Sequence, residues 1–275
     1  MIIFFYKMVF GILYKVGWRK SQISPEKLSV ILLNYARPAN IEIQLRIIFC
    51  CDFVDEVILS NNNPDCDLSS FISTNDPRLK IINQKKRKFP SVRFELGRLA
   101  KNNFIVAIDD DLFPRPDHIQ KLFESLKAEP KIPHGWGGEV YGIDHADSDG
   151  QSKPKMVEFK KYVDAEVDSL VWAFAFTKKI NERYFQILSE IGETNELLSY
   201  SEDVPLSFSG EGPAKIHSSK KICHCPTSLD DSIALHKQSG FGKKRVELVE
   251  VCRKLTGFIP EAEKKKGSPP NKVIA

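Results

Sequence analysis

Short apolar stretches separated by amphipathic ones set the pattern of the first half of the chain. Four apolar runs have the length of buried strands, and two stretches between them carry apolar residues at helical spacing. The predicted strands are 28–33, 54–59, 79–82 and 104–108, and the predicted helices are 39–49 and 92–99. This repeated order of strand, helix and strand predicts an α/β fold with a doubly wound, mostly parallel sheet.

The second half of the chain adds further elements. Residues 170–176 are too apolar to be exposed, and they predict a core strand or the wall of a pocket. The residue spacing predicts a helix at 184–191 and an amphipathic helix at 245–255. Glu202 and Asp203 open another apolar segment, and carboxylates are favoured at the N-terminus of a helix.

The composition fits one folded domain followed by a tail. With 275 residues, of which 42% are hydrophobic, the chain can bury a sizeable core. We predict a single domain at 23–260 and a flexible, charged and proline-rich tail at 261–275. The net charge of +4 is too small to indicate a nucleic-acid partner, so none is predicted.

Residues 1–22 form a separate N-terminal segment. Apolar and aromatic side chains dominate it, but Lys7 and Lys15 interrupt the apolar runs, which are far shorter than the about 20 residues of a membrane span. Aromatic residues together with lysines suit a helix that lies in a membrane interface. A helix packed on the domain is the alternative, and the sequence leaves both open.

The predicted strand 104–108 ends directly in three carboxylates, Asp109, Asp110 and Asp111. Neighbouring negative charges repel one another strongly, so we expect a cation close to them. Carboxylate oxygens suit Mg²⁺ and Mn²⁺, which keep coordination positions for water and substrate phosphates. Because open α/β sheets bind ligands at the carboxyl ends of their strands, the cluster predicts a metal-bound phosphate ester. A helix cap or a solvated turn is the alternative interpretation.

Other cofactor motifs are missing from the sequence. It contains neither the dinucleotide fingerprint Gly-x-Gly-x-x-Gly nor the phosphate loop Gly-x-x-x-x-Gly-Lys-Ser/Thr. The six cysteines show no paired Cys-x-x-Cys spacing, and Cys223-His224-Cys225 is too tight for a usual zinc half-site. We therefore expect these cysteines to be mostly reduced.

An ordered set of motifs resembles a GT-A-type glycosyltransferase. In chain order the motifs are Asn34 to Pro38, Ser60 to Asn62, an arginine before a helix, Asp109 to Asp111, Glu202 with Asp203, and a late basic helix ending in Gly257 to Pro260. Within the GT-A group the chain is most similar to the exostosin C-terminal domain, a family of retaining enzymes that use nucleotide sugars. The resemblance covers 28–260 and implies a nucleotide-sugar half and an acceptor half within one catalytic domain.

The resemblance implies a metal-dependent donor site. Asp111 is expected to bind the Mn²⁺ or Mg²⁺ that bridges the two donor phosphates, with Asp109 and Asp110 contacting the sugar or the ribose. His236 lies near a family histidine and is the second candidate metal ligand. The metal acts as a Lewis acid that stabilises the departing diphosphate.

Four further residues correspond to positions that bind the donor nucleotide. Arg37 and Arg93 match donor-binding arginines and are expected to hold phosphate or base, while Asn61 or Asn62 is expected to contact the base. The donor implied is a nucleotide sugar, with a UDP-sugar expected. The acceptor implied is a glycan or a lipid-linked molecule.

Two residues are candidates for catalysis. Asp203 corresponds to the family's acidic residue near the acceptor and the reactive carbon, and Arg245 corresponds to a late arginine that suits a diphosphate. In the retaining mechanism of the family, the diphosphate leaves on the face that the acceptor attacks and no strong base is needed. In an inverting GT-A enzyme, Asp203 would be the general base.

Other functions and the location of the protein remain as expectations. A metal-dependent phosphatase also uses carboxylates at a strand end, and a non-catalytic nucleotide-sugar binder would keep Asp111.

Ser201 and Leu248 stand where the family has a cysteine pair, so its extracytoplasmic disulfide is lost. This loss favours a reducing compartment, and we predict a cytoplasmic protein with possible peripheral contact to a membrane.

Overall fold

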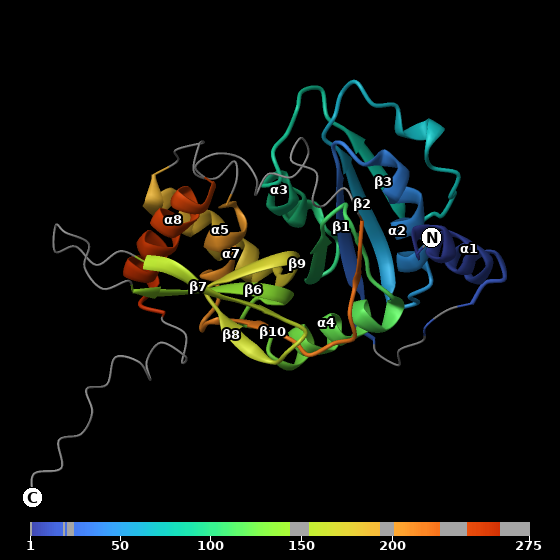
Figure 1. Ribbon diagram of the computed structural model, residues 1–275. Helices are drawn as coiled ribbons and strands as arrows, with labels where there is room; N and C mark the ends of the chain where they lie inside the picture. Colours follow the sequence, from blue (N-terminus) through green and yellow to red (C-terminus); the bar gives the residue numbers. More distant parts are fainter. Residues whose placement is uncertain are drawn as a thin grey trace, which may run out of the picture.

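The fold is built on one large mixed sheet. The computed structural model describes residues 2–18, 20, 25–143, 154–192, 201–225 and 241–258. Within these residues, nine strands pair in the order β3-β2-β1-β4-β9-β6-β10-β8, with β7 paired to β6 (Figure 1). The strands of this sheet are β1 (Leu28–Asn34), β2 (Val54–Asn61), β3 (Leu79–Asn83), β4 (Phe104–Ile108), β6 (His134–Ile143), β7 (Pro154–Lys161), β8 (Ala165–Val167), β9 (Ser169–Thr177) and β10 (Ala214–Ile216). A separate antiparallel pair is formed by β5 (Leu112–Phe113) and β11 (Cys223–His224).

The predicted α/β fold is confirmed, with its parallel part in the first half of the chain. Strands β3, β2, β1 and β4 run parallel, and all seven residues of β1 are buried. Continuous apolar runs are typical of parallel strands covered on both faces, which is why β1, β2 and β4 could be predicted. Strand β3 is the partly exposed edge strand. The predicted strand 170–176 is β9, which pairs antiparallel to β4 and to β6.

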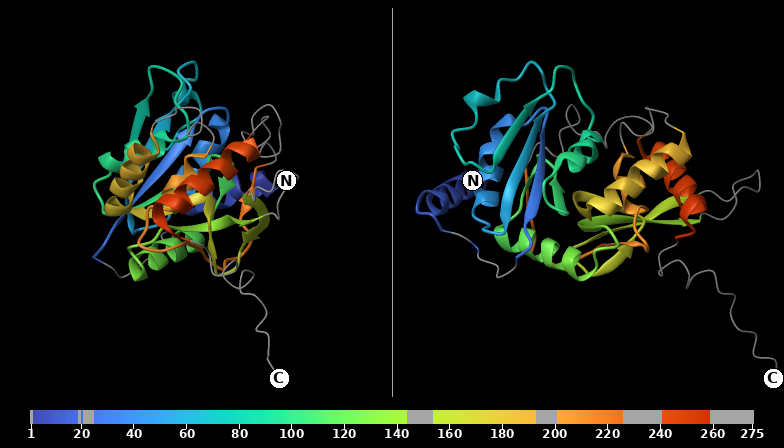
Figure 2. Two further views of the ribbon diagram at one scale, coloured as in Figure 1. Left: turned by 90° about the vertical axis from the view of Figure 1, so that its left-hand side faces the viewer. Right: turned by 180° about the vertical axis from the view of Figure 1, so that it is seen from behind.

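Helices cover both faces of the sheet (Figures 1 and 2). They are α1 (Ile2–Lys15), α2 (Pro38–Phe49), α3 (Val92–Leu99), α4 (Pro116–Ala128), α5 (Lys178–Ile191), α7 (Asp203–Ser207) and α8 (Phe241–Thr256), with a 3-10 turn at Leu68–Ser70. Along β1, Val30 and Leu32 pack into the core with α2 and α4, whereas Ile31 and Leu33 pack into the core with α3 and α5. Side chains alternate between the faces of a strand, so one apolar run supports two helix layers.

The helix α4 and the strand β6 are the longest of the elements that were not predicted from the sequence, which also include β5, β7, β8, β10 and β11. Strand β6 has four glycines among its ten residues, and glycine weakens any strand pattern. These glycines allow close approach of neighbouring strands, because a Cβ atom on Gly138 would lie 2.7 Å from the side chain of Val167. The β6 strand is therefore specified by packing against its neighbours rather than by its own residue pattern.

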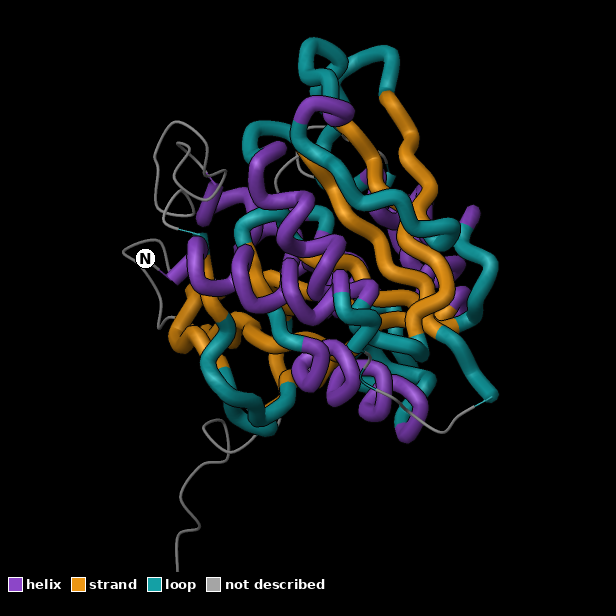
Figure 3. The backbone as a smooth tube through the Cα atoms, turned by 90° about the vertical axis from the view of Figure 1, so that its right-hand side faces the viewer, coloured by secondary structure: helices purple, strands orange, loops and turns teal. Residues whose placement is uncertain are grey.

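The N-terminal helix α1 lies against α2 at the right-hand side of the molecule in Figure 1, which is the side that faces the viewer in Figure 3. Phe10 is buried in the core that α1 shares with α2, and Tyr6 packs on Phe113 of β5 at a ring distance of 6.3 Å. The predicted packing of this segment on the domain is therefore present on one side of the helix. No helix in the described part of the chain is long and apolar enough to cross a membrane.

A buried pair of histidines joins β6 to the strand β10. His134 is fully buried, and its Nε2 lies 2.9 Å from the carbonyl oxygen of Glu129 while its Nδ1 lies 2.8 Å from Nε2 of His217. A carbonyl only accepts, so Nε2 of His134 carries the proton and Nδ1 is the acceptor. Burial is the main cause that lowers the pKa of His134 to about 4, and the neighbouring His217 and Lys215 lower it further.

This histidine makes stability depend on pH. The folded pKa of about 4 lies below the unfolded value of 6.5, so the stabilisation is present above pH 6.5 and is lost as the pH falls towards 4. Between about pH 7 and about pH 5 we expect His134 to account for a loss of about 2 kcal/mol in the free energy of unfolding. Urea denaturation at both pH values should show this loss, and His134→Gln should remove most of it. An equal pH dependence in that variant would contradict the assignment.

Candidate active site at the carboxyl ends of the parallel strands

Asparagine side chains form a ladder of hydrogen bonds along the carboxyl ends of the parallel strands. Asn34, Asn61 and Asn83 occupy aligned positions at the ends of β1, β2 and β3. The Asn34 side chain donates to Asn61 at 3.0 Å, and Asn61 donates to Asn83 at 3.2 Å. Asn62 accepts from Ser60 at 2.7 Å. Asn61 and Asn62, predicted to bind the base, are thus at the expected edge of the sheet, but both are buried with partners in the protein.

The acidic cluster follows β4 and is held by α2. Asn40 donates to the carbonyl oxygen of Asp110 at 2.8 Å, and Gln44 donates to the carbonyl oxygens of Asp109 and Leu112, both at 2.8 Å. Asn40 and Gln44 are one helical turn apart, so they lie on the same face of α2. Both are buried positioning residues that the sequence analysis did not identify. Their signal was a pair of amides at helical spacing within an otherwise apolar helix face.

Two arginines face the three carboxylates. The Arg37 guanidinium lies 2.5 Å from Asp110 and 3.8 Å from Asp111. Arg93, which is buried in α3, lies 2.7 Å from Asp109. Both predicted donor-binding arginines are therefore at the cluster, but each is engaged with a carboxylate. A donor diphosphate would have to share or exchange these contacts.

Of the three aspartates, Asp111 carries the negative charge that neighbouring cations compensate least. Burial and the neighbouring charges of Asp109 and Asp110 raise the pKa of Asp111 to about 7, and Arg37 only partly offsets them. Burial also raises the pKa of Asp110. A divalent cation would relieve this repulsion, so the donor set fits the predicted metal.

The protein does not supply a complete metal site by itself within the described residues. No group of three His, Cys, Asp or Glu side chains there could hold a metal ion. Water and phosphate oxygens of a substrate would complete the coordination, as is usual for Mg²⁺. His236, the second predicted ligand, lies outside the described residues.

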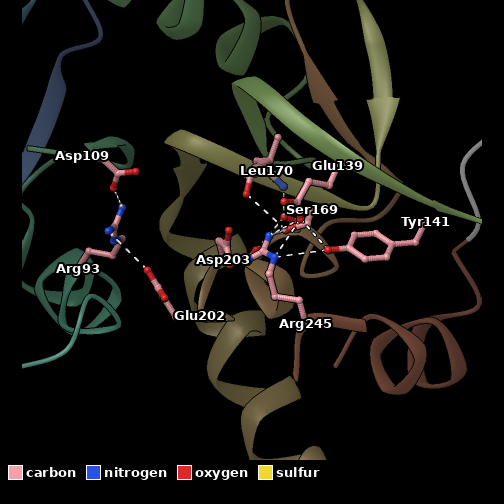
Figure 4. Close-up of polar contacts among 10 residues, drawn as sticks. Arg93, Asp109, Glu139, Tyr141, Ser169, Leu170, Glu202, Asp203 and Arg245 are labelled. Carbon is pink, nitrogen blue, oxygen red and sulfur yellow. Dashed lines mark hydrogen bonds and ion pairs between the residues drawn. The ribbon is translucent and has the colours of Figure 1, made fainter. Parts of the chain in front are cut away.

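Glu202 joins this site from the second half of the chain. Its Oε1 lies 3.5 Å from Arg93, so Arg93 stands between Glu202 and Asp109 (Figure 4). Burial raises the pKa of Glu202 to about 7, and the adjacent Asp203 adds to the shift, while Arg93 opposes it. A carboxyl group with a pKa near neutrality can exchange a proton at working pH. The sequence indicated Glu202 as part of a helix start and of the Glu202-Asp203 motif, but it assigned Glu202 no role of its own.

Asp203 and Arg245 are brought together, but in a neighbouring cluster (Figure 4). Arg245 lies 2.6 Å from Asp203 and 2.7 Å from Glu139, and it donates to Ser169 at 2.7 Å and towards the hydroxyl of Tyr141 at 3.4 Å. The Arg245 side chain is only 3% exposed. These partners explain the burial of a charge in α8, because buried guanidinium groups require paired anions. The predicted contact of Arg245 with a diphosphate would require these bonds to break.

An aromatic group with a strained residue borders the acidic cluster. Trp172 in β9 has a φ of 77°, a left-handed conformation that bulky residues rarely adopt, and its carbonyl oxygen accepts from the backbone of Asp109 at 3.0 Å. The ring of His224 lies edge-on to the Trp172 ring at 4.6 Å, and Tyr162 lies 6.0 Å from it. Residue 224 also pairs with Leu112 of β5, so His224 is close to the cluster. The sequence indicated Trp172 only as part of 170–176, a core strand or the wall of a pocket, and no sequence signal pointed to His224 as a site residue.

Comparisons with known proteins give a family match and a similar fold. The family model of Glycosyl transferase family 2 matches residues 29–186. Among solved structures, the crystal structure of GalNAc-T7 with UDP, GalNAc and Mn²⁺ has a similar fold, with a TM-score of 0.51 and 12% identity over 82% of this chain. The match covers 48% of the GalNAc-T7 chain, so this chain spans about half of its length. No curated protein sequence matches the chain.

A more distant similarity is to CMP:2-keto-3-deoxy-manno-octonic acid synthetase complexed with CTP. It has a TM-score of 0.46 and 10% identity, and it covers 76% of this chain and 98% of that chain.

The burial of Arg245 predicts a stability effect. Arg245→Met would leave the buried Asp203 and the half-buried Glu139 as uncompensated acids, so we expect the free energy of unfolding to fall by about 3–5 kcal/mol. Arg183→Met is the matched control, because Arg183 is exposed and its ion pair with Glu190 should contribute less than about 1 kcal/mol. Urea denaturation of the two variants makes the comparison. Wild-type stability combined with lost donor affinity in Arg245→Met would instead assign this residue to the donor.

Proposed function

The chain belongs to glycosyl transferase family 2, and from this membership we propose that its acidic cluster binds a nucleotide-sugar donor, expected to be a UDP-sugar, together with Mn²⁺ or Mg²⁺. The sugar is transferred to a hydroxyl group of a glycan or lipid-linked acceptor. The GalNAc-T7 structure, which shares the fold, contains UDP and Mn²⁺, the same classes of ligand.

The observation that carries the proposal is the excess of carboxylates at the end of β4. Among the described residues, four carboxylates (Asp109, Asp110, Asp111 and Glu202) share the guanidinium groups of Arg37 and Arg93, and the pKa of Asp111 is raised to about 7. Asp111 would hold the cation, which supplies Lewis-acid stabilisation of the leaving diphosphate. The chain itself fixes Asp111 through the hydrogen bonds that α2 makes to the backbone of Asp109 and Asp110.

The two arginines keep their predicted role as donor-binding residues in this proposal. Arg37 and Arg93 already lie within 4 Å of carboxylates at the cluster, so both can reach an anion placed beside it. The planar guanidinium group binds phosphate oxygens in the same bidentate way as it binds carboxylates. With a cation bound to the carboxylates, the arginines would be able to donate part of their hydrogen bonds to the diphosphate.

The acid pair at the start of α7 supports an inverting reaction. The retaining mechanism was implied by resemblance to the exostosin domain, whereas the family that matches is glycosyl transferase family 2. An inverting reaction needs a base that takes the proton of the acceptor hydroxyl. The sequence pointed to Asp203 for this role. The ion pair of Asp203 with Arg245 and the pKa of about 7 for Glu202 favour Glu202 as the base.

The metal prediction concerns Asp111. In a thermal-shift experiment with UDP, Mn²⁺ should raise the melting temperature of the wild type, because a ligand that binds only the native state stabilises it. Asp111→Asn should abolish the part that depends on Mn²⁺, and the free variant should be at least as stable, since a repelled carboxylate is removed. Asp55→Asn is the control, because Asp55 lies near the opposite, amino-terminal end of β2.

An Mn²⁺-dependent shift that survives in Asp111→Asn would remove the central claim of this proposal. Release of inorganic phosphate from simple esters without an acceptor would indicate the phosphatase alternative. Donor binding without any transfer would indicate a binding protein.

The base prediction compares two neighbouring carboxylates. Glu202→Gln should lower turnover about a hundredfold or more with little change in donor affinity, as expected when a group acts in the transition state. Asp203→Asn should mainly lower stability, because Arg245 loses a partner. Turnover per folded molecule compares the two variants, and NMR of the product's anomeric carbon shows whether the configuration is inverted. Retention of configuration, or a turnover loss confined to Asp203→Asn, would reject Glu202 as the base.

A further inference from the structure

Helix α1 has two apolar faces, and only one of them packs on the protein. The inner face is formed by Phe10, which is buried, together with Tyr6, Leu13 and Tyr14, which pack on the core. Gly11 also lies inside, where a Cβ atom would come within 2.9 Å of Arg46 on α2. These contacts fix the orientation of the helix on the domain.

The opposite face forms an exposed apolar stripe. The stripe consists of Phe4, Phe5, Met8, Ile12 and Val16, which are between 49% and 72% exposed. Four of these residues follow one another at intervals of four, which places them along one side of a helix. Val16, the last of the four, directly follows α1 and keeps the helical geometry, because its N–H donates to the carbonyl oxygen of Ile12 at 2.9 Å. A continuous exposed apolar surface of this kind marks an interaction site on a soluble protein.

The charges on α1 are all positive. The helix contains Lys7 and Lys15 and no Asp or Glu. Both lysines are exposed, and neither forms an ion pair within the described part of the chain. With 3.6 residues per turn, Lys15 lies on the side of the stripe and Lys7 lies beside its border. A lysine can bury its methylene stem along an apolar surface while its ammonium group reaches an anion.

We propose that α1 docks flat on an anionic phospholipid surface through this stripe. The apolar side chains would enter the boundary between headgroups and acyl chains, and Lys7 and Lys15 would reach the lipid phosphates. In a usual interfacial helix, the face turned away from the lipid is polar and meets water. In α1 this face is apolar and packs on α2 instead. A second copy of the chain is a poorer occupant, since two such faces would bring like charges together. The proposal is independent of the donor chemistry.

The test uses the full chain and two kinds of vesicle. One kind is pure phosphatidylcholine, and the other contains about one third phosphatidylglycerol as the anionic lipid. We expect the wild type to sediment with the anionic vesicles and to be released by salt. Ile12→Glu should lower this binding by about tenfold or more, because it places a charge within the stripe. Lys7→Gln combined with Lys15→Gln should reduce the preference for anionic vesicles.

The matched control is Leu99→Glu, which makes the same change at an exposed residue of another helix. It should bind anionic vesicles as the wild type does. Thermal unfolding should be unchanged in Ile12→Glu, because the side chain it replaces is exposed. Absence of binding to anionic vesicles, or equal binding by Ile12→Glu, would overturn the proposal. Self-association that Ile12→Glu abolishes, without vesicle binding, would assign the stripe to a second copy and overturn it as well.

Discussion

The repulsion among three adjacent carboxylates at the end of β4 is the constraint around which this part of the molecule is arranged. Charges this close are tolerated in a partly buried place only when cations or hydrogen bonds compensate them. Arg37 and Arg93 provide the cations, and they come from the helix starts that follow β1 and precede β4. The positions of α2 and α3 are therefore coupled to the acidic cluster. Asp111 keeps the least compensated charge, which is the property that a metal-binding site requires.

A second buried arginine extends the same principle to the other half of the sheet. Arg245 neutralises Asp203 and Glu139, and Arg253 is paired with Asp168 at 2.8 Å. These pairs attach α8 to β6 and to the start of α7. Because Glu202 and Asp203 are neighbours in sequence, the two charge clusters meet at one short helix. Arg93 links this helix back to Asp109 at the end of β4, so the site draws on both halves of the domain.

The N-terminal helix α1 has a packed inner face and an exposed outer face, and the two follow different rules. Its inner side follows the rule for any helix that packs on a domain, with a buried aromatic residue and a glycine at the closest approach. Its outer side breaks that rule, because large apolar side chains remain exposed there. A segment with two apolar faces and only positive charges is consistent with a protein that meets both its own core and a lipid surface. Of the two alternatives that the sequence left open, packing on the domain is present on the inner face, and contact with a membrane stays a proposal for the outer face.

The sequence by itself determined the local features of this protein. Continuous apolar runs specified the buried parallel strands, and three adjacent aspartates predicted a ligand site at the carboxyl end of β4. The tertiary structure alone decided which charges are paired. Arg245 is 42 residues from Asp203 and 106 residues from Glu139, and a local pattern carries no information about contacts at such separations. Sequence reasoning therefore predicted the residue types of the candidate site, but only packing between distant elements buried Arg245 and brought Glu202 and His224 close to the aspartates.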